Sequence, residues 1–311
     1  MSKGKRKEYA MQSIRDFITW ISESQSLITG HESVAECFPK SSNISSTQDD
    51  SEYQGNPRLG FLYQELCRRL FEQSKLHSVF AEEIQLQRDG RTLGAIDFLI
   101  EKRGEPRLEH WEVAIKFYLL KDGLWYGPNA KDRLDKKLSR MLDHQLKMSD
   151  TPAFKSQYPD LVSPSQHLLM QGRLYINPFE QKDVPTECVG LRINPQRITG
   201  YWCYQSQFHR INEPVYRLEK PLWATGKRQH GDSDPVSALP KHFIHCQAES
   251  GQFWFIVLMI GRKAVCKKLI SSTETKQTQP ALDYDPTRHF QVYSLPLTSF
   301  LDRRCDRVAV R

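Results

Sequence analysis

Apolar residues recur at helical and strand spacings along much of this 311-residue chain, and the pattern predicts an ordered α/β protein. Residues 9–26 place apolar side chains every three or four positions, which predicts an amphipathic helix. A polar segment that is poor in apolar residues, 41–56, is typical of a linker or a long surface loop. A second helix is predicted by one stripe of leucines, namely Leu59, Leu62, Leu66 and Leu70.

Strand-like runs follow this second helix. Arg88-Asp89-Gly90 separates the first two runs and indicates a hairpin turn. Residues 131–147 contain neither Gly nor Pro and predict another helix. The strands that we predict before residue 180 are 83–87, 93–101, 108–119 and 167–176. Those that we predict after residue 180 are 189–193, 199–204, 215–218 and 252–260.

These elements divide the chain into four expected parts. Residues 1–40 are expected to form an N-terminal helical extension, and 41–56 the polar linker or loop. Residues 57–180 are expected to form an α/β core with a central mixed sheet flanked by helices. Residues 181–311 are expected to form a β-rich C-terminal region.

Two predicted strands carry charged residues where an apolar face is expected. Side chains alternate along a strand, so Glu112 and Lys116 share one face of 108–119, opposite its apolar face. Asp97 is likewise the lone carboxylate on one face of the preceding strand. Adjacent antiparallel strands bring Asp97 and Glu112 within reach of one ion, and two neighbouring carboxylates repel unless a cation neutralises them. Such oxygen ligands favour Mg²⁺ or Mn²⁺ over Zn²⁺.

Positive charge adds a candidate partner. The net charge of +7 favours polyanions, and Lys137 and Arg140 belong to a cation-rich helix at 131–147. One interpretation of this helix is a phosphate-contacting face beside the carboxylates. The other is a solvated helix with ion pairs at i,i+4 spacing, and the sequence leaves both open.

Several longer phrases resemble a known family. They are RLG at 58–60 with EL at 65–66, LGAIDFLI at 93–100, HWEVAIKFYL at 110–119, WYGPN at 125–129, and DRLDKKL at 132–138 with DHQL at 143–146. In these phrases the chain resembles a bacterial family, domain-of-unknown-function family 1853. At 57–147 it is similar to the PD-(D/E)XK, or restriction-endonuclease-like, nuclease superfamily.

The resemblance implies a restriction-endonuclease-like fold and Mg²⁺- or Mn²⁺-dependent hydrolysis of phosphodiester bonds in DNA. Within it, Asp97 and Glu112 hold the metal, and Glu65 completes the metal site or binds a second ion. Lys116 steadies the attacking water and the scissile phosphate. The residues that would contact the substrate near the site are Lys137, Arg140, His144 and Gln145.

One position departs from the family pattern, in which lysine lies two residues after the acidic residue. Ala114 occupies that position, and Lys116 lies on the same face but about 7 Å farther along the strand. The alternative function is therefore an inactive nucleic-acid-binding or protein-interaction module. The structural alternatives are a backbone-satisfied Asp97, an exposed Glu112–Lys116 ion pair and a solvated Glu65.

The remaining sequence features concern location and other metals. Seven scattered cysteines without a CxxC pair favour reduced thiols, and no run of apolar residues is long enough to cross a bilayer. We therefore expect a cytoplasmic protein without a secretory signal. His242, His245 and Cys246 suggest a transition-metal site, but no second ligand pair lies at a standard spacing.

Overall fold

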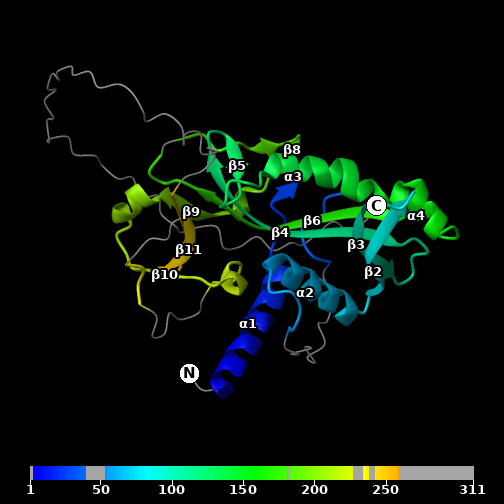
Figure 1. Cartoon of the computed structure of the whole chain (residues 1–311), viewed down its shortest axis with the longest axis horizontal. Coiled ribbons are helices and arrows are strands. Elements are labelled where there is room, and N and C mark those ends of the chain that lie inside the picture. The colour runs from blue at the N-terminus through cyan, green and yellow to red at the C-terminus, as the bar shows by residue number, and fades with distance from the viewer. Residues whose placement is uncertain (1–2, 40–52, 181, 227–233, 238–241, 259–311) are drawn as a thin grey trace, which may run out of the picture. The chain divides into compact units, whose positions relative to one another are not determined.

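The structure is a computed structural model that describes residues 3–39, 53–180, 182–226, 234–237 and 242–258 (Figure 1). The chain divides into two compact units, 1–263 and 264–311, and every described residue belongs to the first. Most of the predicted linker and the end of the predicted strand 252–260 lie outside the described residues.

One nine-stranded mixed sheet forms the centre of this unit. The strand order is β10-β11-β12-β9-β6-β4-β3-β2, with β5 paired to β4 outside this path. β4, β6, β9 and β12 run parallel to one another, and the other neighbours pair antiparallel. The strands are β2 (His77–Arg88), β3 (Arg91–Lys102), β4 (Glu109–Lys121), β5 (Leu124–Tyr126), β6 (Ser165–Ile176), β9 (Ile198–Tyr204), β10 (Val215–Arg217), β11 (Phe243–Ala248) and β12 (Phe253–Val257). The expected α/β class with a large mixed sheet is confirmed.

Two helices pack on one face of the sheet. α1 (Lys3–Glu23) and α2 (Leu59–Gln73) lie on the same side of β4 and β6 in Figure 1. The leucine stripe of α2 is buried, as its spacing predicts, because it packs on the apolar face of β3 and β4. The shared core includes Leu66, Leu70, Phe98, Trp111 and Val113.

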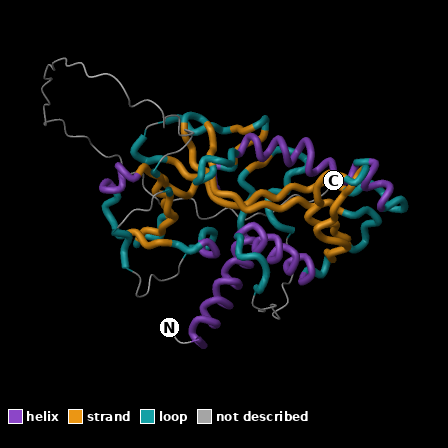
Figure 2. Tube along the Cα trace, in the orientation of Figure 1, coloured by secondary structure: helices purple, strands orange, loops and turns teal. Residues whose placement is uncertain are grey.

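A continuous helical segment covers the opposite face. It begins with α3 (Leu134–Arg140), passes through a π turn, η1 (Met141–Gln145), and ends in a 3₁₀ turn, η2 (Leu146–Asp150). α4 (Pro152–Gln157) follows at once, and Figure 2 shows these helices across the strands from α2. The sequence predicted one helix over 131–147, whereas the structure changes helical geometry twice. π turns are rare and occur frequently at functional sites.

Two further comparisons with the sequence pattern are informative. The predicted hairpin turn is confirmed, because Asp89 (φ 51°) and Gly90 (φ 73°) adopt the positive φ angles of a type I′ turn. The pattern missed β11 and a small separate sheet in the order β1-β8-β7. The strands of that sheet span only two or three residues, namely β1 (Ile28–Thr29), β7 (Glu187–Cys188) and β8 (Leu191–Ile193), too short for a periodic signal.

No helix in the described part of the chain has the length and apolar character needed to cross a membrane. The described cysteines are free thiols, namely Cys37, Cys67, Cys188, Cys203 and Cys246. Cys266 and Cys305 lie outside the described residues.

Candidate active site

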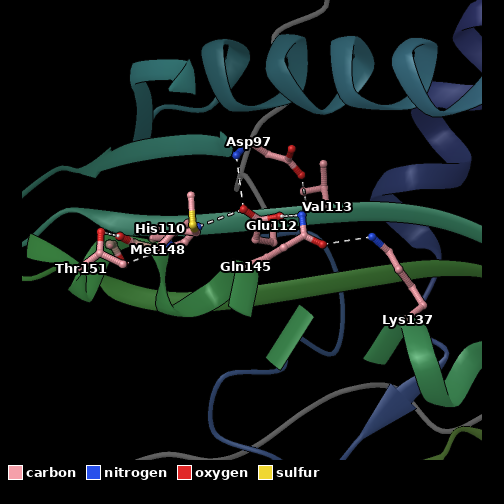
Figure 3. Close-up of polar contacts among 9 residues, drawn as sticks. Asp97, His110, Glu112, Val113, Lys137, Gln145, Met148 and Thr151 are labelled. Atoms are coloured by element: carbon pink, nitrogen blue, oxygen red, sulfur yellow. Dashed lines mark hydrogen bonds and ion pairs between the residues drawn. The ribbon is translucent and has the colours of Figure 1, made fainter. Parts of the chain in front are cut away.

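The two predicted acidic residues meet where β3 and β4 separate. Regular pairing of these strands runs from Ile100–Glu109 to Phe98–Trp111 and then stops. Beyond it the Val113 N–H donates to Asp97 Oδ2 at 3.0 Å, and the Asp97 N–H lies 3.4 Å from Glu112 Oε1 (Figure 3). Each carboxylate therefore takes the place of a backbone acceptor on the opposite strand. The structure brings Asp97 and Glu112 together, as their positions on adjacent strands predict.

Glu112 is fully buried and held by side chains on the α3 side of the sheet. His110 Nε2 lies 3.1 Å from Glu112 Oε1, and His110 Nδ1 lies 2.9 Å from Ser149 Oγ. Burial lowers the pKa of His110 to about 4, so the imidazole is neutral at pH 7. A neutral His110 that donates from Nε2 to Glu112 and accepts from Ser149 satisfies all three groups.

The π turn places Gln145 beside the same carboxylate. Gln145 Nε2 donates to Glu112 Oε2 at 3.0 Å, and Lys137 Nζ donates to Gln145 Oε1 at 3.1 Å. Figure 3 shows this chain of contacts running from Lys137 to Glu112. Lys137 is partly buried, and burial, followed by the nearby Lys116, lowers the pKa of its ammonium. The positive charge of Lys137 in turn favours the ionised forms of Asp97 and Glu112.

Both carboxyl groups have strongly perturbed acidities. Burial, and then the neighbouring Glu112, raises the pKa of Asp97 to about 8, although the Val113 N–H opposes the shift. Burial also raises the pKa of Glu112 to about 7. Two buried carboxyl groups that resist ionisation together are a suitable environment for a divalent cation, which replaces their protons.

The carboxylates are also the right type and number for one cation. In the described residues no group of three or more His, Cys, Asp or Glu side chains is placed to hold a metal. Mg²⁺ commonly binds through one or two carboxylates, with waters and phosphate oxygens completing its coordination. Asp97 and Glu112 therefore fit a hard cation that shares its coordination with a phosphate. Their role as metal ligands remains a prediction.

Two other predicted residues take different positions. Lys116 Nζ pairs with Asp132 Oδ2 at 2.8 Å, and the Tyr118 hydroxyl donates to the same oxygen at 3.2 Å. Glu65 lies on α2, across the sheet from Glu112, and its carboxylate pairs with Arg68 and with Arg69, each at 2.8 Å. The geometry joins neither residue to the acidic pair.

The remaining predicted substrate contacts lie on the helical segment that carries Gln145. Arg140 and His144 are exposed, and His144 Nε2 lies 3.2 Å from the Leu93 carbonyl oxygen of β3. His245 of the alternative transition-metal group is buried and pairs with the Tyr175 hydroxyl at 2.9 Å. The sequence analysis missed Ser149 and the position of Asp132; His110 carried a signal, because it lies two residues before Glu112 on the same strand face.

These acidities predict how stability depends on pH. The pKa values of Asp97 and Glu112 are raised in the folded state, so their stabilising contribution is complete only at low pH and is lost as pH rises through about 7 and 8. In EDTA we expect Asp97→Asn to melt above the wild type, with the gain growing from pH 5 to pH 8.5 by about 3 °C or more. Differential scanning fluorimetry measures this. A pH-independent difference would contradict the assignment, and Mg²⁺ is expected to stabilise only the wild type at pH 8.5.

The comparisons with known proteins give a family and nothing finer. No curated protein matches the chain, and no solved structure matches it. Residues 19–261 match the family described as Domain of unknown function (DUF1853), and this range contains β2 to β12 and the whole candidate site. The chain therefore belongs to the DUF1853 family.

Proposed function

We propose that this protein is a metal-dependent nuclease that hydrolyses phosphodiester bonds in DNA. The observation that carries the proposal is the Asp97–Glu112 pair, two carboxyl groups with raised pKa values held together at a break in strand pairing. Perturbed acidic groups of this kind are enriched at functional sites. Mg²⁺ or Mn²⁺ bound between them would supply positive charge to a phosphate and to an attacking water.

The chain's own residues have separate tasks in this proposal. Asp97 is held by the Val113 N–H, and Glu112 is held by His110 and Gln145, so both carboxylates are positioned before substrate arrives. Glu112 is inaccessible to bulk solvent, which strengthens its interaction with a cation. The cation-rich α3 segment lies beside the pair and would contact the phosphate backbone.

The restriction-endonuclease-like fold and the bacterial, cytoplasmic setting belong to the same proposal. The chain order α2, β2, β3, β4, α3, β6 supports the first, because it follows the helix, three-strand, helix order of the resemblance. The acidic pair lies on the second and third of those three strands. Free thiols at the described cysteines suit a reducing compartment.

Lys137 is the ammonium group that the geometry places nearest in function to the missing lysine of the motif. It reaches Glu112 through Gln145, whereas Lys116 is held by Asp132. We expect Lys137→Met to lower the hydrolysis rate about a hundredfold, because a cation at the phosphate is lost. Single-turnover cleavage measures the rate.

The exposed neighbour Lys136 provides the matched control, because Lys136→Met makes the same change outside these contacts. Lys116→Met tests the alternative assignment. A larger loss from Lys116→Met than from Lys137→Met would return the role to Lys116, and equal losses from Lys136→Met and Lys137→Met would remove Lys137 from the mechanism.

A second candidate function is a nucleic-acid-binding module without hydrolysis. The observation that favours it is the Lys116–Asp132 ion pair, which leaves the motif lysine away from the acidic pair. Incubation of purified protein with single-stranded, duplex and circular DNA in Mg²⁺ or Mn²⁺ separates the two. Cleavage that EDTA abolishes supports the nuclease; salt-dependent binding without cleavage supports the module.

A further inference from the structure

A pocket of about 290 Å³ opens along β4, beyond the acidic pair. We call it the β4-edge pocket and define it by Arg58, Lys116, Asn129, Lys220, Trp223 and Phe243. Its walls come from the start of α2, the middle of β4, the loop before α3 and the segments on either side of residues 227–241. Segments far apart in the sequence thus meet at one hollow.

The pocket lies where β4 has an open edge. β4 pairs with β3 only as far as Trp111 and with β5 only from Leu119, so within the described residues the intervening edge has no strand partner. The Val113 N–H points to this edge, because it donates to Asp97. Backbone groups alternate in direction along a strand, so the N–H groups of Ile115 and Phe117 point to the same edge and into the pocket wall.

The polar lining is positively charged. Three of the lining side chains are cations and one is a carboxylate, Asp132, which is engaged by Lys116. Arg58 and Lys220 are exposed and make no ion pair with another described residue. Two unpaired cations facing one hollow favour an anionic ligand, and the adjacent strand N–H groups add donors.

Aromatic rings form the other wall. Trp223 is only partly buried and packs edge-to-face on Phe117, with ring centroids 5.7 Å apart. Phe243 packs edge-to-face on Trp223 at 6.1 Å and is also partly buried. Cations beside accessible aromatic rings are the combination with which proteins bind unpaired nucleotides, phosphate on the cations and base on the ring.

The pocket and the acidic pair share one strand. Glu112 and Lys116 lie four residues apart on the same face of β4, which is about 13 Å. We propose that the β4-edge pocket binds a nucleotide unit of a single-stranded nucleic acid chain, a few nucleotides from the bond at the acidic pair. The distance to that bond rests on the proposed nuclease function, whereas binding itself does not.

Binding is tested on the full chain carrying Asp97→Ala, without metal, by fluorescence anisotropy of a labelled oligothymidylate. Reversing both unpaired cations, Arg58→Glu with Lys220→Glu, is expected to weaken binding about tenfold or more and to reduce the salt dependence by about 1.4, or about 0.7 per phosphate contact. Lys75→Glu with Arg103→Glu is the matched control, because it reverses two exposed cations outside the pocket. Equal losses from the two double variants, or no loss from the first, would overturn the proposal.

The aromatic wall and the ligand class have separate readouts. Oligothymidylate is expected to quench tryptophan fluorescence, and Trp223→Phe, which keeps a ring in place, is expected to remove most of that quenching. Unchanged quenching would overturn the stacking. Inorganic phosphate and oligoglutamate are expected to compete poorly; competition by either one as strong as that of unlabelled oligothymidylate would assign the pocket to free phosphate or to an acidic protein partner.

The two proposals fail in distinguishable ways. Cleavage is measured in Mg²⁺ on proteins with Asp97 intact. Pocket-dependent binding without any cleavage supports the pocket and removes the nuclease. Metal-dependent cleavage with normal binding by the Arg58→Glu, Lys220→Glu variant supports the nuclease and removes the pocket.

Discussion

Asp97→Asn is expected to lower the rate of Mg²⁺-dependent DNA hydrolysis by about a thousandfold or more. Asparagine keeps the shape of the side chain and one oxygen acceptor for the Val113 N–H, but it removes the negative charge that a cation requires. Glu112→Gln is expected to have a similar effect. Because both carboxylates serve one ion, the double variant should lose little more than either single variant.

Initial rates of cleavage over a range of Mg²⁺ concentrations measure this loss. Asp143→Asn is the matched control, since Asp143 is an exposed acidic residue of η1, and its rate should equal that of the wild type. The raised pKa of Asp97 separates lost chemistry from lost folding, because the inactive variant should be more stable than the wild type at high pH in EDTA. Wild-type cleavage by Asp97→Asn would remove the basis of the proposed reaction.

Gly172→Ala is expected to destabilise the protein by about 3 kcal/mol or more. Gly172 lies on β6 opposite Lys116 of β4, with φ at +144°, and a Cβ there would lie 1.7 Å from the Lys116 carbonyl oxygen. That oxygen belongs to the strand backbone, so the clash is relieved only by separating two central strands. Since β4 carries Glu112, the same change should also disturb the acidic pair.

Urea unfolding followed by circular dichroism measures the destabilisation. Gly60→Ala is the control, because a Cβ at Gly60 in the first turn of α2 meets no atom within 4 Å. That substitution is expected to leave stability unchanged or to raise it slightly. An unfolding midpoint of Gly172→Ala equal to that of the wild type would show that β4 and β6 tolerate a side chain at their contact.

Strands and helices with a strong period were predictable because they bury one face. The leucine stripe of α2 and the apolar faces of β3 and β4 appear in the sequence at the spacings that burial requires. The Asp97–Glu112 meeting was predictable for the same reason, because one-carboxylate faces on adjacent strands converge. β11 is buried on both faces, so it lacks the alternation that identifies a half-exposed strand.

Lys116 shows the limit of strand-face arithmetic. Its face was predicted correctly from the alternation, and its sequence position places it near Glu112. Its ammonium nevertheless pairs with Asp132, a residue of the loop before α3. A long flexible side chain takes the nearest carboxylate in space, and the loop that supplies this carboxylate is positioned by tertiary contacts.

The amino-acid sequence by itself therefore determined the α/β class, the main elements and the two strands that carry the acidic pair. Only the tertiary structure decided which groups surround that pair, because His110, Ser149, Gln145 and Lys137 converge through a π turn that has no periodic signature. It also decided the β4-edge pocket, whose walls come from segments up to 185 residues apart in the chain, Arg58 to Phe243. Periodicity reports the burial of each element separately, whereas a site depends on how those elements are packed together.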